Sequence, residues 1–147
     1  MNISDFLAPA DVIVGLRANA KDNVIRDLAR RAASATGIDA AVIANALQAR
    51  ERLGSTGLGH GFALPHARIP GLTRFFGAFV RLARPIDFQA IDDAPVDLVF
   101  LLLIPADAEN EHVAALAAIS RRLRNPEVLK GVRKADNATT LHSLIAA

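Results

Sequence analysis

One segment constrains the fold more than any other: Leu98–Ile104, a run of seven consecutive apolar residues. Pro105 ends this run, and seven residues are too few to cross a bilayer as a helix. A short apolar run without alternation is typical of a central strand that is covered on both faces. Because helical and strand-like segments are interspersed around it, the sequence predicts an α/β or α+β fold whose sheet is covered by helices.

Hydrophobic periodicity predicts the remaining elements. Apolar residues recur at i, i+3 and i+4 in Lys21–Thr36, which indicates a helix with Gly37 as its C-cap. Asp39 is suited to cap the next helix, which extends to about Glu51. Further helices are predicted at Glu111–Arg124, Pro126–Lys134 and Thr139–Ala146, and strands at Asp11–Leu16, Phe75–Leu82 and Asp97–Ile104.

Composition narrows the classes of protein to consider. The 147 residues, 52% of them hydrophobic, fit one domain over residues 1–147 with a sizeable core. The absence of cysteine excludes disulfides, thiolate catalysis and cysteine-ligated zinc. The first residues lack the features of a signal peptide, and no apolar run is long enough for a membrane helix, so we expect a cytoplasmic protein. A net charge of +2, without a basic tail or aromatic–basic interleaving, does not indicate nucleic-acid binding.

The segment from Gly54 to Pro70 differs from the rest because it is rich in glycine and proline and holds two of the four histidines. Its glycines allow unusual backbone angles, and its N–H groups could form a concavity that binds an anion. Hydroxyl and guanidinium groups accompany the glycines, from Ser55, Thr56, Arg50, Arg52 and Arg68. Together these groups predict a phosphate site. The segment matches neither a P-loop nor a dinucleotide fingerprint, and a tight loop without a ligand is the alternative.

His66 is the candidate nucleophile of this segment. It follows Pro65, which fixes the local backbone, and a neutral imidazole is available near pH 7. Attack on a phosphoryl group needs mainly positioning and charge stabilisation, which nearby arginine, hydroxyl and N–H groups supply. The competing interpretation is a histidine that caps or packs without chemistry.

His112 stands at the start of a predicted helix, where free N–H groups favour an anion. It shares a face with Leu116, Ile119 and Leu123, and so a half-buried packing role is the alternative. His60 is expected in an exposed loop and His142 on a helix surface. Zinc bound by His60, His66 and His112 is conceivable, but no HExxH or close ligand pair supports it, and we predict no metal and no cofactor.

The run RERLGSTGLGHGFALPHARIPGL resembles the active-site signature of enzyme IIA domains of the fructose/mannitol type in the bacterial phosphotransferase system. PIDFQAIDDAPVDLVFLLLIP and ENEHVAALAAISRRLRNPEV extend the resemblance over nearly the whole chain, and it is closest to the nitrogen-regulatory branch. The resemblance implies a mixed, mostly parallel sheet with helices on both sides. It implies that His66 is phosphorylated, that His112 is the second active-site histidine, and that Arg50 is the active-site arginine. Ser55 and Thr56 match loop hydroxyls near the phosphate.

The resemblance also implies partners. The donor would be the phosphohistidine of an HPr-type phosphocarrier, and the phosphorylation state would regulate targets such as potassium transporters, sensor kinases, or nitrogen and carbon regulators. Two alternatives stay open: a sugar-specific IIA that passes phosphate to a IIB domain, and a binding module whose histidine is not phosphorylated.

Overall fold

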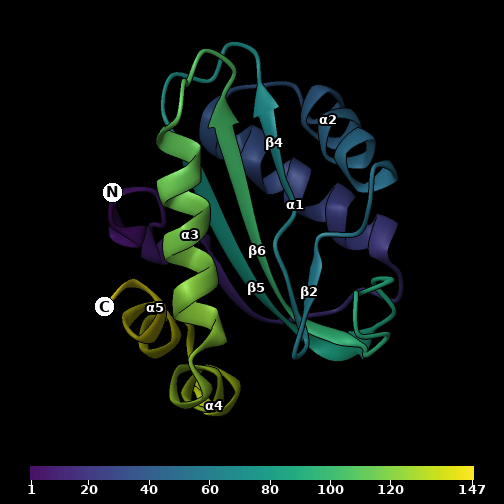
Figure 1. Cartoon of the computed structure of the whole chain (residues 1–147), viewed down its shortest axis with the longest axis vertical. Helices are drawn as coiled ribbons and strands as arrows, with labels where there is room; N and C mark the ends of the chain where they lie inside the picture. The colour runs from purple at the N-terminus through teal and green to yellow at the C-terminus, as the bar shows by residue number, and fades with distance from the viewer.

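The computed structural model describes all residues, 1–147, as one α/β unit (Figure 1). The helices are α1 (Lys21–Thr36), α2 (Ala40–Arg52), α3 (Glu111–Arg124), α4 (Pro126–Lys134) and α5 (Ala138–Ala146), with short 3-10 turns η1 (Ile3–Asp5) and η2 (Pro9–Asp11). The strands are β1 (Val12–Leu16), β2 (Gly57–Gly59), β3 (Phe62–Ala63), β4 (His66–Ile69), β5 (Phe76–Ile86) and β6 (Val96–Pro105).

The sheet is mixed and is organised around β6. Its order is β1-β5-β6-β3-β2, and β4 also pairs with β6, beyond β3 along the same edge. The β1–β5, β3–β6 and β4–β6 pairs are parallel, whereas β5–β6 and β2–β3 are antiparallel. The predicted fold class is therefore confirmed, including the sheet with helices on both faces.

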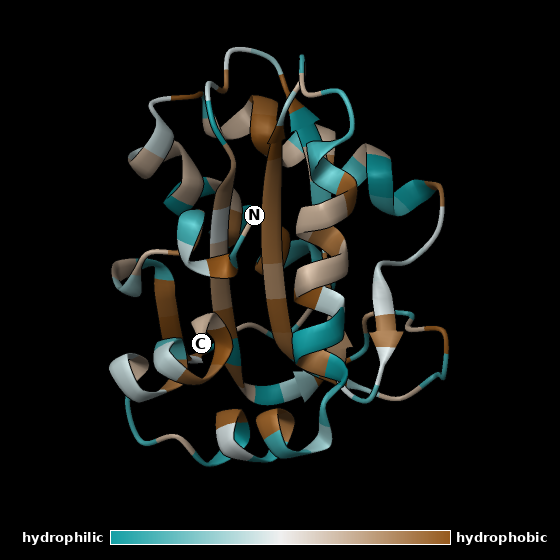
Figure 2. Ribbon diagram, turned by 60° about the vertical axis from the view of Figure 1, so that its left-hand side comes forward, coloured by the Kyte–Doolittle hydropathy of each residue, from teal (hydrophilic) through white to brown (hydrophobic).

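Two hydrophobic layers flank the sheet, as the apolar run predicts. α1 and α2 pack on one face through residues such as Leu28 and Leu47, while α3, α4 and α5 pack on the other face through residues such as Ile119. Figure 2 shows the hydrophobic colour along most of the two long central strands. Leu98–Ile104 is buried throughout because its alternate side chains enter the two cores in turn.

Local capping explains why several boundaries agree with the prediction. Gly37 ends α1 in the left-handed region at φ 78°, where glycine is unstrained. The Asp39 carboxylate accepts the Ala41 N–H at the start of α2. Asn125 and Asn137 cap α4 and α5 in the same way. None of the helices has the length and apolar character that a membrane crossing requires.

The sequence prediction missed three strands. The pattern indicates no strand in residues 54–70, which nevertheless form β2, β3 and β4. These strands are two to four residues long, too short for a periodic pattern, and β3 and β4 exist because they add to β6. The physical consequence is that the glycine-rich segment is held against the most buried strand of the protein.

Candidate functional site

His66 is the first residue of β4, and the sheet fixes its backbone. It lies opposite Leu102 of β6, and the carbonyl of the preceding Pro65 accepts the Leu102 N–H at 3.0 Å. The imidazole is half-buried, and its Nδ1 lies 2.8 Å from the Leu64 carbonyl oxygen. Since a carbonyl oxygen can only accept, Nδ1 carries the proton and donates it. The neutral ring therefore presents the lone pair of Nε2.

The surroundings of His66 favour this neutral form. Burial lowers the pKa of His66 below its ordinary value of 6.5, and the electrostatic effects of Arg50 and the neighbouring His112 act in the same direction. The Leu64 carbonyl and the Glu51 carboxylate oppose them, but the net direction is downward. His66 is consequently a neutral, nucleophilic imidazole at neutral pH, with its one ring proton on Nδ1. The contributions of Arg50, Glu51 and His112 show that the site draws on α2 and α3 as well as β4.

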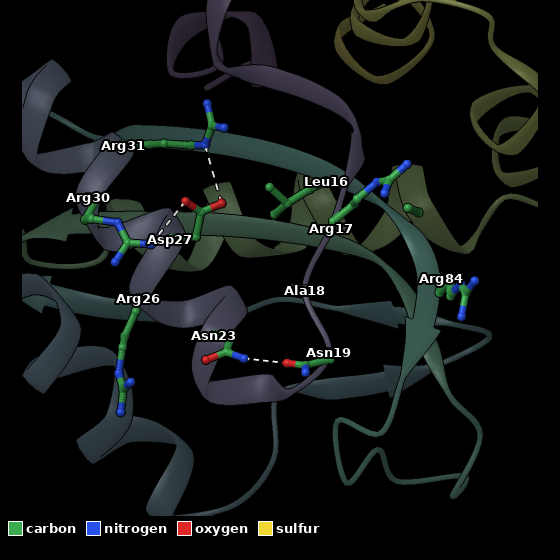
Figure 3. A pocket seen from close by; sticks show the side chains of 11 residues that line it. Leu16, Arg17, Ala18, Asn19, Asn23, Arg26, Asp27, Arg30, Arg31 and Arg84 are labelled. Carbon is green, nitrogen blue, oxygen red and sulfur yellow. Dashed lines mark hydrogen bonds and ion pairs between the residues drawn. The ribbon is translucent and has the colours of Figure 1, made fainter.

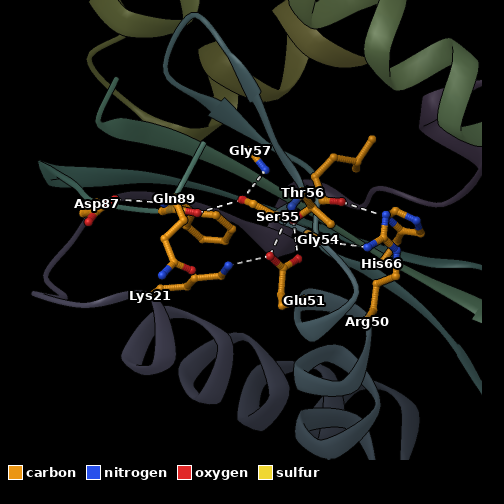
Figure 4. Close-up of polar contacts among 12 residues, drawn as sticks. Lys21, Arg50, Glu51, Gly54, Ser55, Thr56, Gly57, His66, Asp87 and Gln89 are labelled. Carbon is orange, nitrogen blue, oxygen red and sulfur yellow. Dashed lines mark hydrogen bonds and ion pairs between the residues drawn. The ribbon is translucent and has the colours of Figure 1, made fainter. Parts of the chain in front are cut away.

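Arg50 reaches the site from the last turn of α2. Its Nη1 donates to the Gly54 carbonyl oxygen at 3.0 Å, which holds the half-buried side chain beside the loop (Figure 4). A guanidinium has five N–H donors, so this contact leaves donors for an anion at His66. The electrostatic effects of Arg50 and His112 on His66 show that the fold places these three residues near one another.

Glu51, which the sequence prediction did not select, connects α1 to the loop before His66. Its carboxylate pairs with the Lys21 Nζ at 2.7 Å, and the two side chains are only 6% and 16% exposed. The carboxylate also accepts the Thr56 N–H at 3.1 Å and the Thr56 hydroxyl. Lys21 lies 4.7 Å from the centre of the Phe88 ring, which adds a cation–π contact. The sequence does not reveal such an ion pair, because the fold decides which charged side chains meet.

A chain of hydrogen bonds runs from this ion pair to His66. The Thr56 carbonyl accepts the Leu64 N–H at 2.9 Å, and the Leu64 carbonyl in turn accepts the His66 Nδ1–H. Glu51 therefore fixes Thr56, Thr56 fixes Leu64, and Leu64 sets which imidazole nitrogen is free. Figure 4 shows Glu51, Thr56 and His66 within one group of polar contacts.

The hydroxyls of Ser55 and Thr56 are engaged in internal contacts. Ser55 Oγ donates to the Phe88 carbonyl at 2.7 Å and accepts the Gly57 N–H at 3.0 Å. Thr56 is 2% exposed and its hydroxyl is bound to Glu51. Both residues thus shape the loop, while the predicted contact of their hydroxyls with a phosphate stays a prediction.

His112 approaches from the first turn of α3, where it is oriented by Arg68. Arg68 Nη2 lies 3.3 Å from His112 Nδ1, and because a guanidinium only donates, this contact places the His112 proton on Nε2. Arg68 Nη1 donates to the carbonyls of Ala106 and Ala108, at 3.2 and 2.7 Å, and so ties β4 to the loop that leads into α3. The sequence indicates Arg68 only as a cation close to the glycine-rich segment. Its orienting contact appears only in the fold.

The other histidines lie apart from this arrangement. His60 is exposed in a turn with φ 56°, as expected. His142, predicted on the surface, is half-buried, and its Nε2 donates to the Leu7 carbonyl at 2.8 Å, so it joins α5 to the N-terminal segment. The structure contains no group of three or more His, Cys, Asp or Glu side chains placed to hold a metal ion.

Comparison with known proteins identifies the family. The family model described as phosphoenolpyruvate-dependent sugar phosphotransferase system, EIIA 2, matches residues 5–147. The chain belongs to this family. The EIIA 2 chain is 42% identical to a nitrogen regulatory protein of Bradyrhizobium diazoefficiens, over 99% of this chain and 95% of the relative.

Further relatives include both branches that the sequence left open. The chain is 37% identical to a fructose-specific EIIA component of Haloferax volcanii, over 82% of this chain and 77% of the relative. The crystal structure of the nitrogen regulatory protein IIA-Ntr from Neisseria meningitidis superposes with a TM-score of 0.93 at 29% identity, covering 97% of this chain and 98% of that one. The resemblance found in the sequence is thereby confirmed.

Proposed function

We propose that this protein is a phosphoryl carrier of a bacterial phosphotransferase system, which accepts phosphate on His66 and regulates cytoplasmic partner proteins through its phosphorylation state. The observation that carries the proposal is the arrangement of His66: the Leu64 carbonyl holds Nδ1 and leaves the lone pair on Nε2, and Arg50 and His112 lie close enough to act on the imidazole electrostatically. Similarity to nitrogen regulatory proteins supports the regulatory role.

The transfer step needs no metal or nucleotide, because the donor is an HPr-type phosphohistidine whose P–N bond is already activated. The lone pair of His66 Nε2 attacks phosphorus, and the donor P–N bond breaks with its electron pair returning to the donor imidazole. Nδ1 keeps its proton on the Leu64 carbonyl throughout, so the product is a phosphohistidine at Nε2. Transfer onward to an acceptor is the same step in reverse.

Two cationic or donor groups offset the charge that arrives with the phosphoryl group. Arg50 supplies a permanent charge beside His66, and bidentate guanidinium contacts suit phosphoryl oxygens. His112, with its proton on Nε2, can donate a hydrogen bond to another oxygen. Stabilising charge that is already in position is the main contribution a protein makes to such a transfer.

Exposed apolar side chains beside the site suit a protein donor. Leu53, directly after α2, is 85% exposed, and Val113, next to His112, is 59% exposed. Addition of about two negative charges between them would change which surfaces can dock there. Regulated targets of the potassium-transporter or sensor-kinase type therefore bind differently to the two forms.

A sugar-specific IIA is the second candidate, favoured by the 37% identity to a fructose-specific component. Its chemistry at His66 is identical. Transfer of label from the phosphorylated protein to a purified fructose- or mannitol-type IIB would favour this candidate, whereas a phosphate that stays on the protein favours the regulatory one.

The test of the main proposal is phosphorylation by enzyme I, an HPr-type carrier and labelled phosphoenolpyruvate. Wild type and His60→Asn, a control that removes an exposed histidine, are expected to acquire acid-labile label, and His66→Ala is expected to acquire none. Absence of label on the wild type would reduce the protein to a binding module, and label on His66→Ala would refute the assigned residue.

A further inference from the structure

An arginine-rich groove lies at the β1 edge of the sheet, and the proposed phosphotransfer does not use it. Five arginines line it: Arg17, Arg26, Arg30, Arg31 and Arg84. Figure 3 shows them on both walls, with three on α1 and the other two at the ends of β1 and β5. The only acidic residue that lines the groove is Asp27.

The groove holds positive charge that the fold does not compensate. Five arginines against one aspartate give the groove a formal charge of +4. Because the net charge of the whole chain is +2, the residues outside the groove together carry −2. Asp27 makes only long contacts, at 3.5 Å to Arg30 and 3.7 Å to Arg31. Arg17, Arg26 and Arg84 have no acidic partner within 4.0 Å and donate no hydrogen bond within the protein. Their donors are therefore free.

The groove is separate from the phosphoryl site. It lies along β1 and β5, whereas His66 belongs to β4, on the far side of β6. The two share no residue, and α1 presents Lys21 to Glu51 at one end while its arginines face the groove. A partner in the groove would leave His66 accessible to its phosphoryl donor.

We propose that this groove is a second docking surface, which binds an extended acidic segment of a partner protein. Guanidinium forks match carboxylates in bidentate pairs. The arginines are spread over three chain segments and point in different directions (Figure 3), which suits a run of separated carboxylates better than one compact anion. No aromatic side chain lines the groove, so it offers no surface on which nucleic-acid bases could stack.

The test uses the full chain and a fluorescein-labelled oligoglutamate peptide, with oligoglutamine as the uncharged probe. Fluorescence anisotropy at low salt measures the affinity of wild type, of Arg26→Gln/Arg84→Gln, and of the control Arg74→Gln/Arg121→Gln. All four arginines are exposed and make no ion pair in the structure, so both variants lose the same charge and keep the fold. We expect the groove variant to bind about 5- to 30-fold more weakly and the control to stay within about twofold of wild type.

Location is measured by amide chemical-shift changes on adding the peptide. Changes concentrated in residues 16–31 and 83–84 support the groove. Changes centred on residues 50–68 would place the peptide at the phosphoryl site and overturn the proposal. Equal weakening of binding in both variants, binding of oligoglutamine, or no detectable binding of oligoglutamate would also overturn the proposal. So would displacement of the peptide by a single-stranded oligonucleotide or by polyphosphate at a lower concentration of negative charges than competing oligoglutamate requires.

Discussion

Replacement of Glu51 by glutamine tests whether the buried ion pair supports both the fold and the site. Glutamine has almost the same shape and keeps one oxygen for Thr56, but it loses the charge that faces Lys21 at 2.7 Å. Removal of one partner from a buried pair costs about 3–5 kcal/mol. Lys21 retains 16% exposure and its contact with Phe88, so we expect a smaller cost than for a fully buried pair, about 2–3 kcal/mol.

The assay is reversible unfolding in guanidinium chloride, followed by circular dichroism. A loss of about 2–3 kcal/mol corresponds to a fall in Tm of about 4–12 °C for a domain of this size. Glu109→Gln is the matched control, because Glu109 is exposed and makes no ion pair, and its change should stay within about 0.5 kcal/mol. A Lys21→Met variant completes a double-mutant cycle, in which the coupling should exceed about 1 kcal/mol.

The same variant tests the chain from Glu51 through Thr56 and Leu64 to His66. Loosening this chain should lower the initial rate of phosphorylation several-fold, even at temperatures where the variant is fully folded. A free energy of unfolding equal to that of Glu109→Gln would refute the energetic argument. An unchanged phosphorylation rate in a destabilised variant would refute the connection to His66.

Two further substitutions and one change of pH test other parts of the structure. Arg68→Lys keeps the charge but loses the fork that binds two carbonyls and His112, so phosphorylation should slow about tenfold at nearly unchanged Tm; a wild-type rate would remove Arg68 from the site. Gly57→Ala would place a methyl group 2.8 Å from Ala90 Cα, and a cost of about 1–3 kcal/mol is expected in guanidinium unfolding, with no change meaning that the backbone yields freely. The lowered pKa of His66 predicts a phosphorylation rate that is constant from neutral to mildly alkaline pH and falls to half only below pH 6.5; a midpoint above 6.5 would contradict it. Since the unfolded histidine binds its proton more readily, this residue's contribution to stability should likewise decline as pH falls below 6.5.

The sequence predicted the larger elements because their signals are local. α1, α3 and α4 have the predicted boundaries, since periodicity, Gly37 and Asn125 all act within a few residues of each helix end. β2, β3 and β4 have no such signal, because their hydrogen bonds come from distant strands. A glycine-rich segment looks like a loop until its partner strand is known.

The prediction of the site shows the same difference between local signals and contacts made only in the fold. The motif around Arg50, His66 and His112 carried over from the family resemblance, and the fold brings these residues together. The roles of Glu51 and Arg68 depend on contacts with residues 21 and 112, which no spacing in the sequence encodes. Ser55 and Thr56 make hydrogen bonds with Phe88 and Glu51 that the sequence does not indicate, and their predicted contact with a phosphate stays a prediction.

The central claim is that His66 accepts phosphate through Nε2 because Leu64 holds Nδ1. The most direct measurement is long-range ¹H–¹⁵N NMR of histidine-labelled protein before and after phosphorylation by enzyme I, the HPr-type carrier and phosphoenolpyruvate. We predict that His66 is the only histidine to which phosphorus couples, that the coupling is to its Nε2, and that its Nδ1 remains protonated. Phosphorus on Nδ1 of His66, or on His60, His112 or His142, would contradict the claim.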